Sequence, residues 1–108
     1  MSRRVLYKYP IYGQGGYTVH AKGANPVVRS FRYQPMSFFG GNHNPEPWVV
    51  YIEHDEPVSS HPGTPVWVYA AHTGEPLPDF VHDKSTRFID TASASNGYTL
   101  YLYAQVMS

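Results

Sequence analysis

Residues 98–106, with the sequence YTLYLYAQV, alternate between two kinds of side chain along their length. Leu100 and Leu102 belong to an aliphatic series at even positions, and Tyr101 and Tyr103 stand at the odd positions between them. An extended strand directs successive side chains to opposite faces, whereas a helix needs apolar residues three or four positions apart. The segment therefore predicts a β-strand with an aliphatic face toward a core and a tyrosine face away from it.

Other segments repeat this alternation, and no segment keeps an apolar period of 3.6 residues over three turns. Ten tyrosines, ten prolines and nine glycines accompany only four leucines, which also disfavours helices. We predict a single all-β domain over residues 1–108, with about seven antiparallel strands in a sandwich or flattened small barrel. The predicted strands cover residues 4–9, 17–22, 27–33, 48–54, 65–72, 87–93 and 98–106. The predicted core contains Val50, Ile52, Val66, Val68, Leu100 and Leu102.

Clusters of Gly, Pro, Asn and Ser separate the predicted strands. GQGG at 13–16 and SNG at 95–97 fit tight reversals, because Gly and Asn tolerate a positive φ. GGNHNPEP at 40–47 and DEPVSSHPGTP at 55–65 predict longer loops.

The chain contains no cysteine, which leaves no disulfide or thiolate metal site and favours an intracellular setting. The longest uninterrupted apolar run, Trp48 to Ile52, is too short to span a membrane. The formal net charge is +0, whereas proteins dedicated to nucleic acid usually have a basic excess. We therefore expect a protein with neither a membrane nor a DNA partner.

The charges are unevenly distributed along the chain. Residues 1–54 hold six Lys or Arg and two acids, a balance of +4, and residues 55–108 hold two and six, a balance of −4. This asymmetry fits head-to-tail self-association or a basic ligand patch. We favour a third interpretation, in which strands from the two halves lie together and their charges neutralise one another.

The segment AAHTGEPLPDFVHD, residues 70–83, holds four side chains of types that bind divalent metals: His72, Glu75, Asp79 and His82. A helix would bring this spacing onto one face, but Pro76 and Pro78 oppose a helix here. We therefore predict a turn that ends a strand, with Thr73 and Gly74 setting its backbone, and no metal or other cofactor.

The segment IEHDEPVSSH contains the side-chain types of a serine hydrolase, namely Ser59, Ser60, His54, His61 and Asp55. A catalytic triad is defined by geometry, which closeness in sequence does not supply. No G-x-S-x-G nucleophile elbow is present. We therefore predict a polar loop at this place and no catalytic residue.

Trp67, Tyr69, Tyr101 and Tyr103 alternate with the aliphatic residues of their strands, so we expect their rings to face away from the core. Exposed rings are typical of an oligomer interface or a ligand platform, although both faces of a central strand can also be buried. The chain is expected to form a homo-oligomer, most simply a dimer, through Tyr101 and Tyr103 or through the Trp67 and Tyr69 face.

Arg29 and Arg32 flank Phe31 on another predicted strand. Their three-residue separation directs them to opposite faces unless a bulge intervenes, so we expect only one of them to serve a given pocket. A nucleotide-like ligand needs a basic group for its phosphate and a ring for its base. The predicted ligand-binding residues are Arg29, Arg32, Trp67, Tyr69 and Tyr103.

Five motifs follow one another along the chain: YKYPI at 7–11, YTVHAKGA at 17–24, PWVVYIE at 47–53, VWVYAAHTGEPLP at 66–78, and RFIDT with NGYTLYLYAQV within 87–106. In order and spacing they resemble a family of small bacteriophage-encoded proteins. That family has a Lys-Tyr-Pro opening, a Lys-Gly-Ala strand, a strand containing Trp, a Thr-Gly-x-Pro-x-Pro turn and a closing hairpin. The likeness covers nearly the whole chain, with insertions at 36–46 and 56–63. It implies a phage accessory protein and brings no catalytic residue.

The residues and the resemblance together predict a non-enzymatic binding protein that acts in the cytoplasm of the infected host. Its expected partner is a host protein or a small nucleotide-like signal, which it would sequester against host defence. The alternatives are an accessory protein of the virion and a metal-dependent hydrolase.

Overall fold

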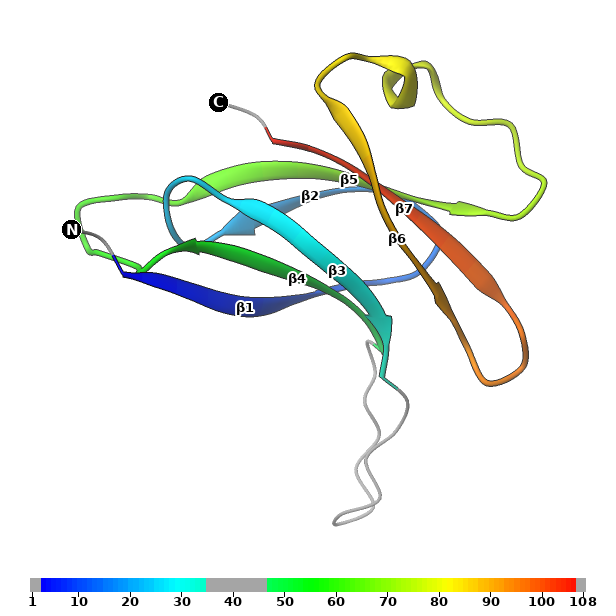
Figure 1. The fold of residues 1–108 in the computed structure, drawn as a ribbon, viewed down its shortest axis with the longest axis horizontal. Helices are drawn as coiled ribbons and strands as arrows, with labels where there is room; N and C mark the ends of the chain where they lie inside the picture. The colour runs from blue at the N-terminus through cyan, green and yellow to red at the C-terminus, as the bar shows by residue number, and fades with distance from the viewer. Residues whose placement is uncertain (1–2, 35–46, 107–108) are drawn as a thin grey trace, which may run out of the picture.

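The structure is a computed structural model that describes residues 3–34 and 47–106. Seven antiparallel strands form two sheets that pack face to face (Figure 1). The strands are β1 (Arg4–Ile11), β2 (Gly15–Ala21), β3 (Val27–Tyr33), β4 (Trp48–Asp55), β5 (Thr64–His72), β6 (Thr86–Ser93) and β7 (Thr99–Val106). The all-β prediction is confirmed, and within the described residues the two sheets form an open sandwich, not a closed barrel.

Sheet A has the strand order β1-β4-β3, and sheet B has the order β2-β5-β7-β6. Each predicted strand matches an observed one to within two residues at either end. The end of β1 and the start of β2 differ most from the prediction, by two residues each, and β1 continues beyond Tyr9 through Pro10, paired with Val49. Proline is tolerated here because β1 lies at the edge of sheet A, where a strand does not have to donate a hydrogen bond on both sides.

The core between the sheets combines large side chains of sheet A with small ones of sheet B. Phe31 is 1% exposed and belongs to the same cluster as four alanines of sheet B: Ala21, Ala70, Ala92 and Ala104. Pairing large with small residues across the interface fills the space between two sheets without voids. All six predicted core residues are 1% exposed or less, so this prediction is confirmed.

One edge of each sheet meets the other, because β3 of sheet A lies beside β6 of sheet B (Figure 1). The backbone N–H of Phe31 donates to the Asp90 carboxylate across this junction at 3.1 Å. Both strands have a register shift nearby, between Val28 and Ser30 in β3 and between Phe88 and Asp90 in β6. Bulges bend and twist an edge strand, and a groove separates the two edges on one side of the Phe31–Asp90 bond.

The connection from β5 to β6, residues 73–85, packs on the outer face of sheet B and is called the strap below. Its first turn, with Gly74 at φ 87°, is the predicted turn that ends a strand. One turn of 3-10 helix, η2 (Asp79–His82), follows Pro78. No helix spans residues 72–82, as expected from the prolines, but the turn of 3-10 helix after Pro78 was not predicted. A proline just before the first helical residue removes no intrahelical hydrogen bond.

The glycine turns predicted at 13–16 and 95–97 are both present, with Gly13, Gly15 and Gly97 at positive φ. The loop predicted over 40–47 lies outside the described residues except at Pro47, and so does the insertion at 36–46. In the part of the chain that the structure describes, no helix has the length and apolar character that a membrane crossing requires.

Candidate functional site

Aromatic side chains line the outer face of sheet B. Cross-strand pairing places Tyr69 opposite Tyr103, and Tyr103 opposite Phe88, which makes a row of rings across three strands. Trp67 is 41% exposed, while Tyr69, Tyr101 and Tyr103 are half-buried. The four rings predicted to face away from the core all lie outside the core cluster. This row of rings and Trp67 are together called the ring face.

The strap covers part of the ring face. The Phe80 ring packs edge-on against Trp67 and Tyr69, with ring centroids 5.7 and 5.9 Å apart. Glu75 anchors the strap by accepting hydrogen bonds from the Tyr69 hydroxyl at 2.7 Å and from Gln14 Nε2 at 2.8 Å. The Tyr69 hydroxyl is the main cause that holds the pKa of Glu75 below its ordinary value. Beside Phe80 lies a hollow of about 350 Å³ whose lining includes no Lys, Arg, Asp or Glu.

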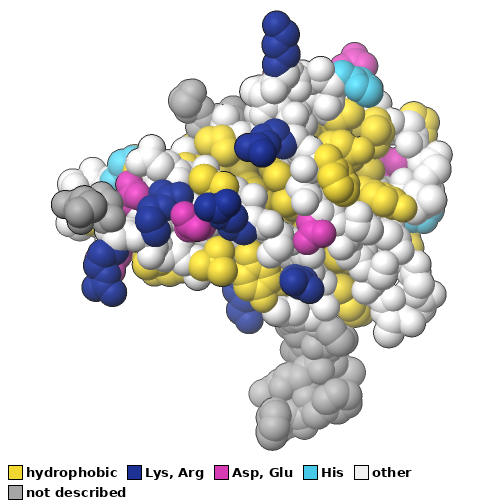
Figure 2. Space-filling view, viewed as in Figure 1, with side chains coloured by type: hydrophobic (Ala, Val, Ile, Leu, Met, Phe, Trp, Pro, Cys, Tyr) yellow, Lys and Arg dark blue, Asp and Glu magenta, His cyan; other side chains and the backbone are white. Residues whose placement is uncertain are grey.

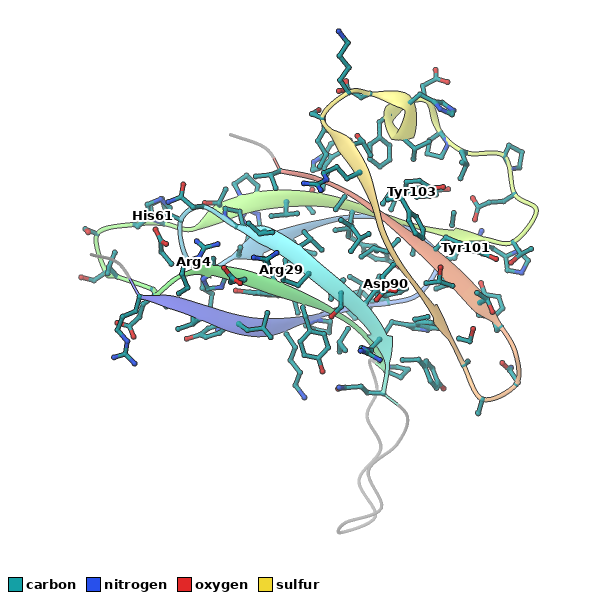
Figure 3. The ribbon with its side chains drawn as sticks, viewed as in Figure 1. Arg4, Arg29, His61, Asp90, Tyr101 and Tyr103 are labelled. Carbon is teal, nitrogen blue, oxygen red and sulfur yellow. The ribbon has the colours of Figure 1, made fainter. Side chains whose placement is uncertain are left out.

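A groove of about 400 Å³ opens between β3 and β6, beside the Phe31–Asp90 bond. Arg29 lines it from β3 and Arg87 lines it from β6. Arg87 pairs with Ala104, a core residue, so its side chain leaves β6 on the side that faces sheet A. Figure 3 labels Arg29 and Asp90 on the two strands that form this junction. Arg29 and Arg87 therefore border the same groove from different sheets.

Phe88, the neighbour of Arg87 in β6, also borders this groove. Its side chain is 54% exposed, and its ring lies edge-on to Tyr103 with centroids 5.5 Å apart. Phe88 thus stands where the groove meets the ring face. Figure 2 shows hydrophobic side chains gathered beside dark-blue basic groups on this side of the molecule.

The two arginines of the groove differ in their partners. Arg29 is held by Glu53 of β4, whose Oε1 lies 3.1 Å from Arg29 Nη2 and 3.2 Å from Nε. Glu53 also binds Arg4, with 2.9 Å between Glu53 Oε2 and Arg4 Nε. The same arginine binds Asp55, with 3.0 Å between Arg4 Nη1 and Asp55 Oδ1. The Arg4 guanidinium is the main cause that holds the pKa of both carboxyl groups below their ordinary values. Arg87 forms no ion pair or side-chain hydrogen bond with any described residue.

The predicted ligand-binding residues do not share one cavity. Arg29 lines the groove, Trp67 and Tyr69 line the hollow beside the strap, and Tyr103 lines a third cavity of about 300 Å³. Arg32 lines none of these three. A bulge at Arg29 interrupts the alternation of β3, so Arg29 and Arg32 do not have to lie on opposite faces of the strand. Both side chains are exposed.

The four residues considered as metal ligands do not converge. The His72 ring stacks on Tyr98, with centroids 5.0 Å apart, and Glu75 is engaged in anchoring the strap. Asp79 and His82 lie in η2. Among residues 3–34 and 47–106, no three His, Cys, Asp or Glu side chains lie close enough together to hold a metal ion.

His54, considered above as a catalytic base, is completely buried. Its Nδ1 donates to the Asp55 carbonyl oxygen at 2.8 Å, because a carbonyl can only accept, and its Nε2 therefore accepts from the Tyr9 hydroxyl at 2.7 Å. The Tyr9 oxygen accepts in turn from the Lys22 N–H at 2.8 Å. Both ring nitrogens are occupied, whereas the two loop serines are exposed. His54 is thus a structural residue of the core.

Arg87 and Phe88 belong to the groove and were not among the predicted site residues. Their signal in the sequence is a basic residue followed by an apolar ring at the start of a predicted strand. Their position across from Arg29 depends on how the two sheets pack, which this dipeptide does not specify.

The fold and the groove define a class of protein: a β-sandwich with a basic and aromatic groove where the edges of its two sheets meet. Comparison of the chain with protein-family models, curated proteins and solved structures finds no match.

Proposed function

We propose that the protein is a non-enzymatic binding protein that holds a phosphate-bearing, nucleotide-like ligand in the groove between β3 and β6. The observation that carries the proposal is that Arg29 and Arg87 line one groove and that Phe88, which is 54% exposed, borders it. Arginine binds phosphate through charge-assisted hydrogen bonds, and an aromatic ring can stack on a nucleobase. The volume of about 400 Å³ also suits a small molecule, since such sites span roughly 300–1,000 Å³.

The resemblance to phage proteins supports a setting for this activity in the cytoplasm of the infected host. There, sequestering a nucleotide signal would oppose a host defence that depends on it. The protein would act stoichiometrically, by binding the signal, and the ligand would leave the groove chemically unchanged. Abundant copies in purified virions would instead favour the alternative of a virion accessory protein.

Calorimetric titration with AMP tests the groove directly. We expect AMP to bind the wild type and Arg87→Gln to weaken binding at least about tenfold, because a hydrogen bond to a charged group contributes about 1.5–3 kcal/mol. Arg32→Gln is the matched control, since Arg32 is an exposed arginine of β3 that does not line the groove. Its affinity for AMP is expected to equal that of the wild type.

Equal losses in Arg87→Gln and Arg32→Gln would contradict the proposal, because they would indicate diffuse attraction to positive charge. A second readout is the protein purified from infected cells, denatured, with its released small molecules identified by mass spectrometry. An intact phosphate-bearing molecule supports binding without turnover. No released ligand, together with no response to AMP, would remove the proposal.

Self-association through the ring face is a second candidate function. Trp67 is 41% exposed there, on the same face of sheet B as Tyr101 and Tyr103, and exposed tryptophans often anchor interfaces. We expect light scattering at micromolar concentration to give the mass of a dimer, and Trp67→Ser to give that of a monomer. A monomeric wild type would remove this candidate and leave the proposal for the groove intact.

A further inference from the structure

The groove between β3 and β6 continues into a second cavity. This cavity has a volume of about 640 Å³, and three residues line both spaces: Pro26, Val27 and Val106. Val27 and Val106 are 36% and 41% exposed, so the shared wall is an accessible apolar surface. The two cavities therefore adjoin along this wall, and they are called the arginine compartment and the His61 compartment below.

The groove can extend in only one direction along the junction. The bond from Phe31 N–H to the Asp90 carboxylate joins the two edges and closes the arginine compartment at one end. Away from that bond, the lining passes from Arg29 along β3 to Pro26, and then to Gly63 and His61 before β5. In Figure 3, Arg29 lies between Asp90 and His61. A ligand bound at Arg29 thus has room to continue toward His61.

The two compartments differ in charge. Two arginines line the first, whereas no Lys, Arg, Asp or Glu lines the second. His61 Nδ1 accepts from the Gly63 N–H at 2.9 Å, so in the neutral ring the proton resides on Nε2, which remains a donor. Asn25 donates its side-chain amide to Asp55 at 3.0 Å, which leaves its Oδ1 as an acceptor. The His61 compartment therefore suits an uncharged group with both acceptors and donors, such as a nucleoside.

From this arrangement, and on the basis of the function proposed above, we infer that the ligand is a dinucleotide joined through a phosphodiester. Arg29 and Arg87 bind the linking phosphate, and one base stacks on Phe88. The second nucleoside crosses the apolar wall of Val27 and Val106 and occupies the His61 compartment. A mononucleotide would leave that compartment unfilled.

The test compares AMP with the dinucleoside monophosphate ApA by calorimetric titration of the full chain. The terminal phosphate of AMP carries about −1.5 to −2 charges at pH 7, whereas the phosphodiester of ApA carries one, so arginine attraction alone favours AMP. We expect ApA to bind at least about tenfold more tightly, which is within the range for stacking one additional base. The additional affinity for ApA over AMP then measures binding of the second nucleoside in the His61 compartment.

Two variants locate that excess. His61→Asn removes the imidazole and its Nε2–H, while the shorter side chain can still accept from the Gly63 N–H. It is expected to bring the ApA-to-AMP affinity ratio close to one. Phe88→Ala is expected to weaken both ligands alike and to keep the ratio. Melting curves without ligand check that each variant is folded.

The outcomes separate the two proposals. Equal affinities of the wild type for AMP and ApA, or a ratio that His61→Asn does not change, would overturn the dinucleotide inference while the groove proposal stands. Failure of both ligands to bind would overturn both. A ratio of about tenfold or more that is lost in His61→Asn and kept in Phe88→Ala would support the inference.

Discussion

Gly23→Ala is expected to lower the free energy of unfolding by about 3–5 kcal/mol. Gly23 is buried between β2 and β3, and a Cβ there would lie 2.0 Å from the Asp55 carbonyl oxygen and 2.6 Å from His54 Nδ1. These two atoms already form a hydrogen bond with each other. The obstruction includes backbone, so the chain must shift and a buried imidazole loses its acceptor.

Urea denaturation followed by tyrosine and tryptophan fluorescence measures this loss. Gly16→Ala is the matched control, because a Cβ at Gly16 would meet its nearest atom, Tyr69 Cδ2, at an ordinary 3.5 Å. That variant is expected to change stability by less than about 0.5 kcal/mol, since alanine loses less backbone entropy in a strand than glycine does. Equal stability of Gly23→Ala and Gly16→Ala would contradict the packing described here.

Phe31→Ala is expected to destabilise the fold by about 3–5 kcal/mol, as is typical when a buried phenylalanine is truncated. Phe31 is 1% exposed and stacks on Trp48 with ring centroids 5.7 Å apart. Its backbone N–H also makes the bond to Asp90 that joins the two sheet edges. The truncation leaves a cavity in the core just where β3 and β6 are held together, so we expect the melting temperature to fall by at least about 10 °C.

Phe88→Ala removes the same side chain from a position that is 54% exposed and serves as the control for burial. Its loss is expected to be about 1 kcal/mol or less, because only the edge contact with Tyr103 disappears. Similar melting temperatures for the two alanine variants would show that burial of the Phe31 side chain does not make the expected contribution to the stability of the fold. The control also establishes that the loss of AMP affinity expected of Phe88→Ala does not arise from unfolding.

Local alternation is enough to predict most of the fold. A strand turns successive side chains to opposite faces whatever surrounds it, so alternation alone predicts Leu100 and Leu102 in the core and Tyr101 and Tyr103 on the opposite face. Both assignments agree with the observed burial. The same rule, carried two residues past Ile52, would also have placed His54 in the core, although its residue type suggested catalysis.

The positions of the turns can be predicted for the same reason, because each turn depends on a few neighbouring residues. Gly74 and Gly97 adopt the positive φ that glycine permits without a Cβ clash, and both lie in turns that the sequence predicts. The short helix η2 is not predicted by a rule that excludes helices from every segment containing proline. Pro78 precedes the helix and lies outside its interior.

The groove depends on contacts between residues that are distant in the chain. Arg29 and Arg87 belong to different sheets, and they border one space only because β3 and β6 meet at their edges. A bulge in each strand, one of them at Arg29 itself, opens that space, and the Phe31–Asp90 bond closes it at one end. No pattern within a single strand encodes such a meeting. The relative position of two sheets follows from the packing of all the core side chains together, and this packing brings the arginines and Phe88 to one groove.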